Sequence, residues 1–294
     1  MQSQTTLARS TEWVTGLQLD REVASSVRFH PAPPDSGVIF VRSDLPGEPS
    51  VKCCLDNARL QSRWSALVQD DVWIHHTEHI LAAIAGHSLD NVIVELTSDR
   101  LPVVTGGSCA GFSQAITGAG IVGLSSAPRR VWRLRRPVWF EMDLHPNSGQ
   151  PDPAAPAGRR YIAGIPDTAF SASYVFHVPH LVGLRVGLAE YRHAIDSFTG
   201  GIGAARTYYL QPEAEMLRDV LSSVQKDYIV LDANSPQRDV DEVARHKLTD
   251  FLGDLMILGR LLEGRFVVFR SGHRFHHALA RRLWDDGYLE VSSQ

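Results

Sequence analysis

RHKLTDFLGDL, residues 245–255, is the most informative segment of this 294-residue sequence. It lies within a stretch whose apolar spacing predicts a long helix over about 240–258. His246, Asp250 and Asp254 fall at i, i+4 and i+8, which places them on one face of that helix. A His and an Asp one turn apart have the identity and spacing of a zinc-ligand pair. Acidic groups on an amphipathic helix are also commonly solvated, so the segment alone leaves both interpretations open.

A second cluster, His75-His76-Thr77-Glu78-His79, opens a stretch that predicts a helix over about 77–85. It could supply one metal ligand, His79, and one general base, Glu78. On its own, the cluster fits a polar helix entry with surface histidines better.

Two loops add further candidates. In SGHRFHH, residues 271–277, His273 follows a predicted strand and a Gly, where a loop can present a side chain to a cleft. His276 and His277 lie further into the next helix and are expected at the surface or in packing. Arg206-Thr207-Tyr208 follows the glycine-rich GGIGA and could approach a ligand, although a flexible loop explains it equally well.

Together, these segments hold the groups that a catalytic zinc site needs. Such a site takes three protein ligands and keeps one position open for water. It also needs a base near that water and an acid for the leaving group. Three candidate ligands, a Glu, a loop His and a carboxylate one turn beyond the ligand pair are present. The combination therefore favours a zinc-dependent enzyme.

The composition excludes several other classes of protein. Hydrophobic residues make up 44% and charged residues 21%, as in ordinary globular proteins, and the net charge of −4 gives no indication of a nucleic-acid partner. No window approaches the roughly 20 apolar residues of a membrane-spanning helix, and the N-terminus lacks a signal-peptide pattern. Three cysteines, two of them adjacent, form a poor disulfide framework, so a cytoplasmic location is expected.

Both halves of the chain follow a strands-then-helix pattern, which predicts an α+β fold with sheets layered against helices. The segment SSAPRR, residues 125–130, is the best candidate for a boundary. We therefore expect two similar domains, over residues 1–126 and 127–294. The proline-rich stretch over 145–160 is expected to be a mobile loop.

The segments resemble the UDP-3-O-acyl-N-acetylglucosamine deacetylases of lipid A synthesis. The family's Thr-Val-Glu-His-type segment corresponds to Thr77-Glu78-His79, and its Ala-Arg-Thr-Phe to residues 205–208. Its Glu-x-x-Arg-His-Lys-x-x-Asp-x-x-Gly-Asp-Leu corresponds to residues 242–255, and its Ser-Gly-His to residues 271–273. The similarity also includes LAAIAGHSLDNVIVEL, residues 81–96, so it covers nearly the whole chain in order.

The resemblance implies a zinc-dependent hydrolysis of the N-acetyl group of UDP-3-O-acyl-N-acetylglucosamine. Zinc would be held by His79, His246 and Asp250 at the interface between the two domains. Glu78 would take a proton from the water that zinc activates.

The resemblance also implies roles for the remaining candidates. Thr207 would donate its hydroxyl to the tetrahedral oxyanion. His273, held by Asp254, would stabilise that charge and protonate the departing amine. Lys247 and Tyr208 would line the sugar-nucleotide side. The implied partner is a small acylated sugar nucleotide, with transient contact to the membrane surface, and a monomer is expected.

The sequence departs from the family's pattern away from the proposed metal site. Asp20 stands where the family has a His, and the segment around Thr105 lacks the family's Asp. Ser222–Asp227 replaces a Gly-Gly-Ser-x-x-Asn in an insert over about 208–232 that would form a passage for an acyl chain. One alternative is therefore a related zinc deacetylase acting on another N-acetylated amino sugar. Another is a non-catalytic protein that binds acylated sugar nucleotides and keeps a structural zinc, although the retained base and acid candidates argue against it.

Overall fold

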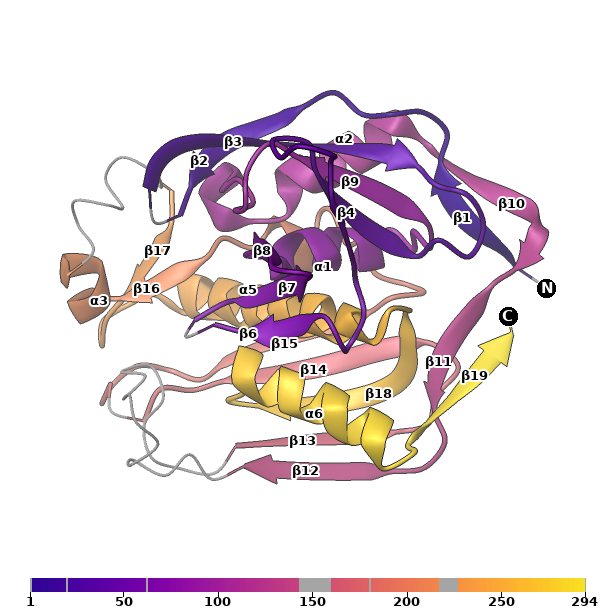
Figure 1. The fold of residues 1–294 in the computed structure, drawn as a ribbon. Helices are drawn as coiled ribbons and strands as arrows, with labels where there is room; N and C mark the ends of the chain where they lie inside the picture. Colours follow the sequence, from indigo (N-terminus) through magenta and orange to yellow (C-terminus); the bar gives the residue numbers. More distant parts are fainter. Residues whose placement is uncertain are drawn as a thin grey trace.

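The computed structural model describes residues 2–19, 21–61, 63–142, 160–179, 181–216 and 227–293. It is a mixed α+β structure in which helices lie between two large sheets (Figure 1), so the expected α+β class is confirmed. The predicted loop over 145–160 lies almost entirely outside the described residues, as does Asp20.

Strands from the first part of the chain build a five-stranded sheet in the order β2-β3-β9-β4-β5. The strand β4 runs parallel to β9, and the other neighbours are antiparallel. Alternate residues such as Val27 and Phe29 are fully buried, as in a strand with one face on the core. The sheet β6-β7-β8 follows in sequence and leads into the first helix. The bounds are β1 Ser3–Leu7, β2 Val14–Gln18, β3 Arg21–Pro31, β4 Val38–Arg42, β5 Ser50–Lys52, β6 Ala58–Leu60, β7 Ser65–Gln69, β8 Val72–His75 and β9 Val92–Leu96.

A seven-stranded sheet is built from the second part of the chain. Its central strand β18 pairs antiparallel with β13 and parallel with both β14 and β11, and β12, β15 and β19 extend the sheet at its edges. Phe266 and Val268 of β18 are fully buried beneath the helices. The bounds are β10 Ile121–Pro128, β11 Arg130–Leu134, β12 Val138–Met142, β13 Arg160–Ile165, β14 Phe170–Phe176, β15 Gly187–Arg192, β16 Tyr208–Leu210, β17 Ile229–Leu231, β18 Leu262–Phe269 and β19 Leu289–Ser293.

Five helices are described: α1 Glu78–Gly86, α2 Ala110–Ala119, α3 Gln211–Met216, α5 Gln237–Leu255 and α6 His273–Asp285, with short 3-10 turns η1 Thr105–Gly107, η2 Ile202–Ala204 and η3 Met256–Leu258. The helices α1 and α5 correspond to the stretches predicted over 77–85 and 240–258. They pack against each other in the middle of the molecule, and α5 also packs on β14 and β15 (Figure 1). Residues expected on a helix face thus reach the centre of the protein.

The predicted boundary over 125–130 falls where β10 passes into β11, with one residue between them. Strand β10 pairs antiparallel with β1 at the N-terminus. The division into domains over 1–126 and 127–294 stays a prediction. Within the expected insert, β16 and β17 pair in parallel, and residues 217–226 lie outside the described part of the chain.

Candidate active site

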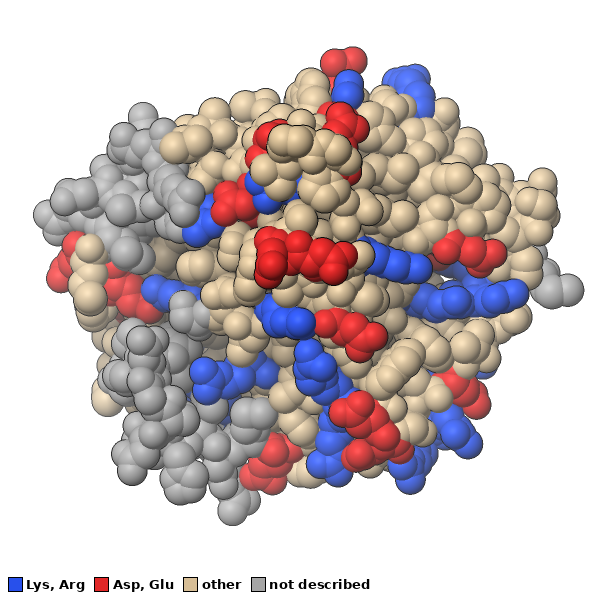
Figure 2. Space-filling model, viewed as in Figure 1, with Lys and Arg blue, Asp and Glu red and all other residues tan. Residues whose placement is uncertain are grey.

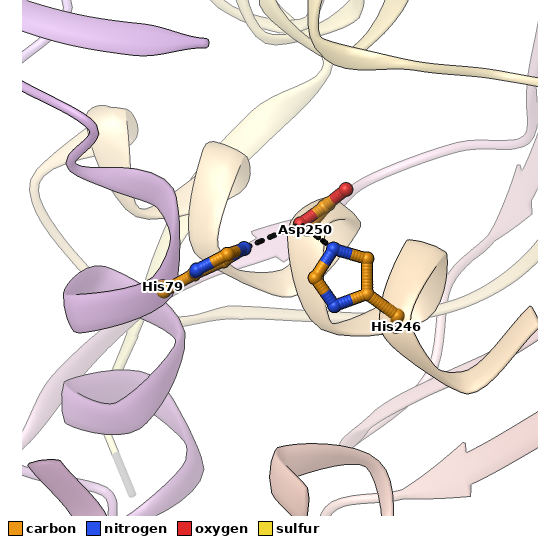
Figure 3. Close-up of side chains that lie close together, drawn as sticks. All are labelled: His79, His246 and Asp250. Atoms are coloured by element: carbon orange, nitrogen blue, oxygen red, sulfur yellow. Dashed lines mark ion pairs between the residues drawn. The ribbon is translucent and has the colours of Figure 1, made fainter. Parts of the chain in front are cut away.

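Three side chains that could hold a metal ion lie together between α1 and α5 (Figure 3). His79 comes from the first turn of α1, whereas His246 and Asp250 lie one turn apart on α5. The Oδ1 atom of Asp250 is 3.2 Å from His79 Nε2 and 3.6 Å from His246 Nε2. Two imidazole nitrogens and one carboxylate oxygen form a donor set that suits a divalent transition metal. The structure therefore brings together the three predicted ligands.

The close approach of α1 and α5 depends on Gly253, which follows the ligand pair on α5. A Cβ atom at this position would lie 2.0 Å from the carbonyl oxygen of Glu78 and 3.0 Å from the backbone nitrogen of Ala82. Both atoms belong to the backbone of α1, so no side-chain rotation could make room. The missing side chain lets α5 carry Asp250 up to His79.

The burial, charge and hydrogen bonding of Asp250 show whether these three residues fit a cation. It is 1% exposed, and its Oδ2 accepts a hydrogen bond of 2.7 Å from Lys247 Nζ. Among the described residues, its Oδ1 has no hydrogen-bond partner. Burial opposes ionisation, but nearby cationic groups, Lys247 foremost, outweigh it and hold the pKa of Asp250 well below its usual range. A buried, ionised oxygen that lacks a donor and faces two imidazole nitrogens fits a metal ligand.

The two histidines present suitable nitrogens. His246 Nδ1 lies 3.3 Å from the carbonyl oxygen of Ala205 and donates to it, which leaves Nε2 unprotonated on the side of Asp250. Burial lowers the pKa of His246 to about 4, so this residue is neutral near pH 7. Burial also acts to lower the pKa of His79, but Asp250 outweighs it and the pKa is raised. Because a metal binds the neutral imidazole, protons and metal compete for His79.

Glu78 precedes His79 and is 6% exposed. Its Oε2 accepts a hydrogen bond of 3.0 Å from the backbone N–H of Ser65 on β7. Burial raises the pKa of Glu78 above its usual value, and the charges of His273 and His79 offset part of that effect. A carboxylate with a raised pKa beside a possible metal site is suited to accept a proton near neutral pH.

Asp254 is fully buried and gathers three polar side chains around its carboxylate. Its Oδ2 lies 2.8 Å from His273 Nδ1 and 2.6 Å from His276 Nδ1, and its Oδ1 accepts a hydrogen bond of 2.5 Å from the Ser65 hydroxyl. Burial disfavours a charged His273, but Asp254 and Asp250 outweigh it and raise the pKa of His273 to about 9. His273 therefore stays protonated near pH 7 in the metal-free protein and can act as an acid.

Comparison with known proteins agrees with this arrangement. Residues 4–285 match the LpxC family, described as UDP-3-O-acyl N-acetylglycosamine deacetylase. The chain belongs to the LpxC family. It is 32% identical over 284 residues to UDP-3-O-acyl-N-acetylglucosamine deacetylase of Thioalkalivibrio sulfidiphilus, a match that covers 94% of this chain and 88% of that protein. It is 30% identical over 285 residues to the protein of the same name from Marinobacter nauticus, with the same two coverages.

Membership of the LpxC family confirms the expectation of an enzyme, because members of this family are deacetylases and therefore hydrolases. The family is metal-dependent, and His79, His246 and Asp250 give this chain a group of residues able to hold a metal ion. The individual residue roles and the identity of the metal stay predictions.

The predicted oxyanion donor of this LpxC member, Thr207, lies in a well-anchored loop. Its backbone N–H donates to the carbonyl oxygen of Gly106, and its own carbonyl accepts from Ile229. The preceding Arg206 forms an ion pair of 2.8 Å with Glu242 on α5. This pairing ties the loop to the helix that carries His246 and Asp250.

The two residues expected on the sugar-nucleotide side lie beside the metal trio. The ring of Tyr208 meets that of His246 edge-on, with ring centroids 6.4 Å apart. Lys247 is only 9% exposed and directs its ammonium to Asp250. Its position in the structure thus links it to the metal trio, and its place on the sugar-nucleotide side stays a prediction.

The sequence alone did not identify three participants in this site. Ser65 stands in β7 without any motif signal. His276 and His277 were expected at the surface or in packing, and the surface alternative is wrong because they are 0% and 5% exposed. Their positions one turn after His273 on α6 were the available signal, since that spacing places all three side chains near one another.

The surface gives a different kind of information. On the face drawn in Figure 2, the side chains of Lys and Arg are interspersed with those of Asp and Glu. No helix in the described part of the chain is long and apolar enough to cross a membrane.

Proposed function

We propose that this protein hydrolyses the N-acetyl group of UDP-3-O-acyl-N-acetylglucosamine, releasing acetate and the free amine, as a step of lipid A biosynthesis. The observation that carries the proposal is the grouping of a possible metal trio with a buried Glu and an Asp-held His. The names of the two relatives, which match 94% of the chain, supply the substrate.

We propose zinc as the metal, held by His79, His246 and Asp250. Two imidazoles with one carboxylate support zinc over magnesium or calcium, which prefer oxygen ligands. Bound there, zinc would lower the pKa of a water molecule toward about 7 and polarise the acetyl carbonyl.

The residues of the chain then have distinct tasks. Glu78 takes a proton from the attacking water while a C–O bond forms to the acetyl carbon. Thr207 donates its hydroxyl hydrogen to the oxyanion that develops on the carbonyl oxygen. His273, oriented by Asp254, gives its proton to the amine nitrogen as the C–N bond breaks, which leaves the amine and acetic acid. Acetic acid then ionises to acetate, Glu78 loses its proton to solvent and His273 takes one up, so the net reaction converts amide and water into amine, acetate and one proton.

The site lies between α1 and α5, which supports its placement at the interface of the two proposed domains. Tyr208 and Lys247 would face the sugar nucleotide, and the insert over 208–232 would receive the acyl chain. A cytoplasmic location, a monomeric state and transient contact with the membrane surface stay predictions.

A related deacetylase activity on another N-acetylated amino sugar is the second candidate. It is favoured by the ion pair between Lys247 and Asp250, because a lysine held by a carboxylate offers less positive charge to a diphosphate. The two candidates differ in their dependence on the nucleotide.

The test is an assay of amine release from UDP-3-O-acyl-N-acetylglucosamine and from the same acylated sugar without UDP. We expect turnover of the UDP form that is abolished by a chelator and restored by zinc. Equal kcat/KM values for both substrates would favour the second candidate. If protein with one bound zinc releases amine from neither substrate, deacetylation of this substrate class is refuted.

A further inference from the structure

Ser65, the first residue of β7, contacts two residues of the proposed active site. One is Glu78, the proposed base, and the other is Asp254, which holds the proposed acid His273. The backbone N–H of Ser65 donates to Glu78 Oε2 at 3.0 Å, and its hydroxyl lies 2.5 Å from Asp254 Oδ1. Its carbonyl oxygen accepts a hydrogen bond of 3.1 Å from the backbone N–H of Thr77, just before α1. The side chain is completely buried. The backbone N–H and the hydroxyl of this residue are therefore directed at the site, and its carbonyl oxygen at the backbone that enters α1.

The direction of these hydrogen bonds follows from what each group can donate. The carboxylate of Asp254 is ionised and can only accept, so the single hydroxyl hydrogen of Ser65 points to Oδ1. The Ser65 oxygen is also 2.8 Å from His277 Nε2 and must accept there. His277 is therefore protonated on Nε2, a tautomer that follows from the network.

The opposite oxygen of Asp254 receives the proposed acid. His273 and His276 both present Nδ1 to Oδ2, at 2.8 Å and 2.6 Å. The carboxylate can rotate about its Cβ–Cγ bond only if one of these contacts is lost. The hydrogen bond from the Ser65 hydroxyl to Oδ1 thus fixes the orientation of the Asp254 carboxylate, and with it the direction from which Oδ2 contacts His273.

We propose that Ser65 is a positioning residue that sets the geometry between the base Glu78 and the acid His273. Its backbone holds the base, and its hydroxyl, supported by His277, holds Asp254 and through it the acid. This inference rests on the proposed deacetylation. It assigns a role to a residue on a strand that precedes both catalytic segments in the sequence.

Removing the hydroxyl separates the contact with Asp254 from the contact with Glu78, because the backbone N–H that holds Glu78 stays. In Ser65→Ala, Glu78 keeps its hydrogen bond while Asp254 loses the donor on Oδ1. We expect kcat to fall roughly 10- to 100-fold, as for the loss of one hydrogen bond to a charged group. KM and the content of bound metal should stay unchanged, since the hydrogen bonds of Ser65 go to Thr77, Glu78, Asp254 and His277 and not to the metal trio.

A spectroscopic measurement distinguishes positioning from general damage. In full-length protein labelled with [15N]histidine, with and without zinc, the Nδ1–H of His273 should give a strongly downfield, hydrogen-bonded signal. Ser65→Ala should shift that signal and the Nε2 signal of His277. Ser113→Ala is the matched control, because Ser113 is also fully buried and its hydroxyl contacts a histidine, His87, outside the site.

We expect Ser113→Ala to lose stability without change in kcat or in the His273 signal. An unchanged kcat in Ser65→Ala, or a lower kcat with an unshifted His273 signal or lost zinc, would overturn the positioning role. Failure of the wild-type enzyme to release amine would instead refute the proposed function, and the histidine signals would still report whether Ser65 orients the His273 side chain.

Discussion

Gly253 lies against the carbonyl oxygen of Glu78, with no room between the two backbones for even a methyl group. We expect Gly253→Ala to separate α1 from α5, destabilise the protein by about 1–3 kcal/mol or more, and weaken metal binding. The physical reason is that His79 moves with α1 while Asp250 stays on α5. Denaturant titration and metal analysis measure the two effects.

Gly118→Ala is the control for this substitution. Gly118 lies on α2, and nothing is within 4 Å of the position that its Cβ would take. This variant should be more stable than the wild type by up to about 1 kcal/mol, because alanine has the higher helix propensity. Equal stability and metal content in both variants would show that the helices tolerate a wider separation.

A second prediction concerns the metal. His246→Ala should not retain zinc through gel filtration, because two remaining protein ligands rarely hold a catalytic zinc. Gln211→Ala, an exposed substitution on α3, should retain one zinc per chain. Elemental analysis of both proteins decides the matter, and zinc retained in His246→Ala at the wild-type level would mean that the ligands are misassigned.

A third prediction separates the base from the acid. Glu78→Ala and His273→Ala should each lower kcat by about 10²–10⁴-fold while zinc stays bound, since neither is a proposed ligand. Activity requires an ionised Glu78, whose pKa is raised by burial, so it falls at low pH. Activity also requires a protonated His273, whose pKa is raised to about 9 by Asp254 and Asp250 against its burial, so it falls at high pH.

The two variants should therefore lose different limbs of the pH profile. Residual activity of Glu78→Ala should lack the acidic limb, and that of His273→Ala the basic limb. Profiles of kcat from pH 5 to 10 measure this directly. Loss of the opposite limb in either variant would exchange the two roles.

A fourth prediction follows from the buried ion pair of Lys247 and Asp250. Lys247→Met leaves the carboxylate buried without its ammonium partner, which should destabilise the metal-free protein by about 3–5 kcal/mol. A bound divalent cation supplies positive charge to the same carboxylate. Zinc should therefore raise the Tm of the variant more than that of the wild type. Equal gains in Tm would show that Asp250 does not contribute to binding the metal.

A fifth prediction concerns acid stability at a site remote from the trio. His193 bonds to Ser88 and Tyr191, and burial, together with the charges of Arg129 and His87, lowers its pKa to about 4. Because the unfolded chain binds this proton first, the contribution of His193 to stability falls as the pH drops from 6.5 toward 4. His193→Gln should flatten the dependence of unfolding free energy on pH within this window. Parallel curves for the two proteins would contradict the assignment.

The sequence predicted the parts of the site that are local. His246 and Asp250 could be placed on one face of α5 because their spacing equals one helical turn. The contact between Ser65 and Asp254 could not be predicted, because it joins a strand to a helix far along the chain and depends on how the sheets pack. The same holds for the short strands β6 to β8, whose pairing lacks a strong periodic pattern.

The trio also has a consequence for how the protein is made. His79 lies in the first third of the chain, and its two partners follow on α5, close to the C-terminal end of the sequence. A polypeptide still emerging from the ribosome, or one cut short before α5, carries a single member of the trio. Capture of a metal by all three side chains would therefore require synthesis at least through α5 and docking of the two helices. Metal content would thereby report that synthesis has passed α5 and that α1 and α5 have docked.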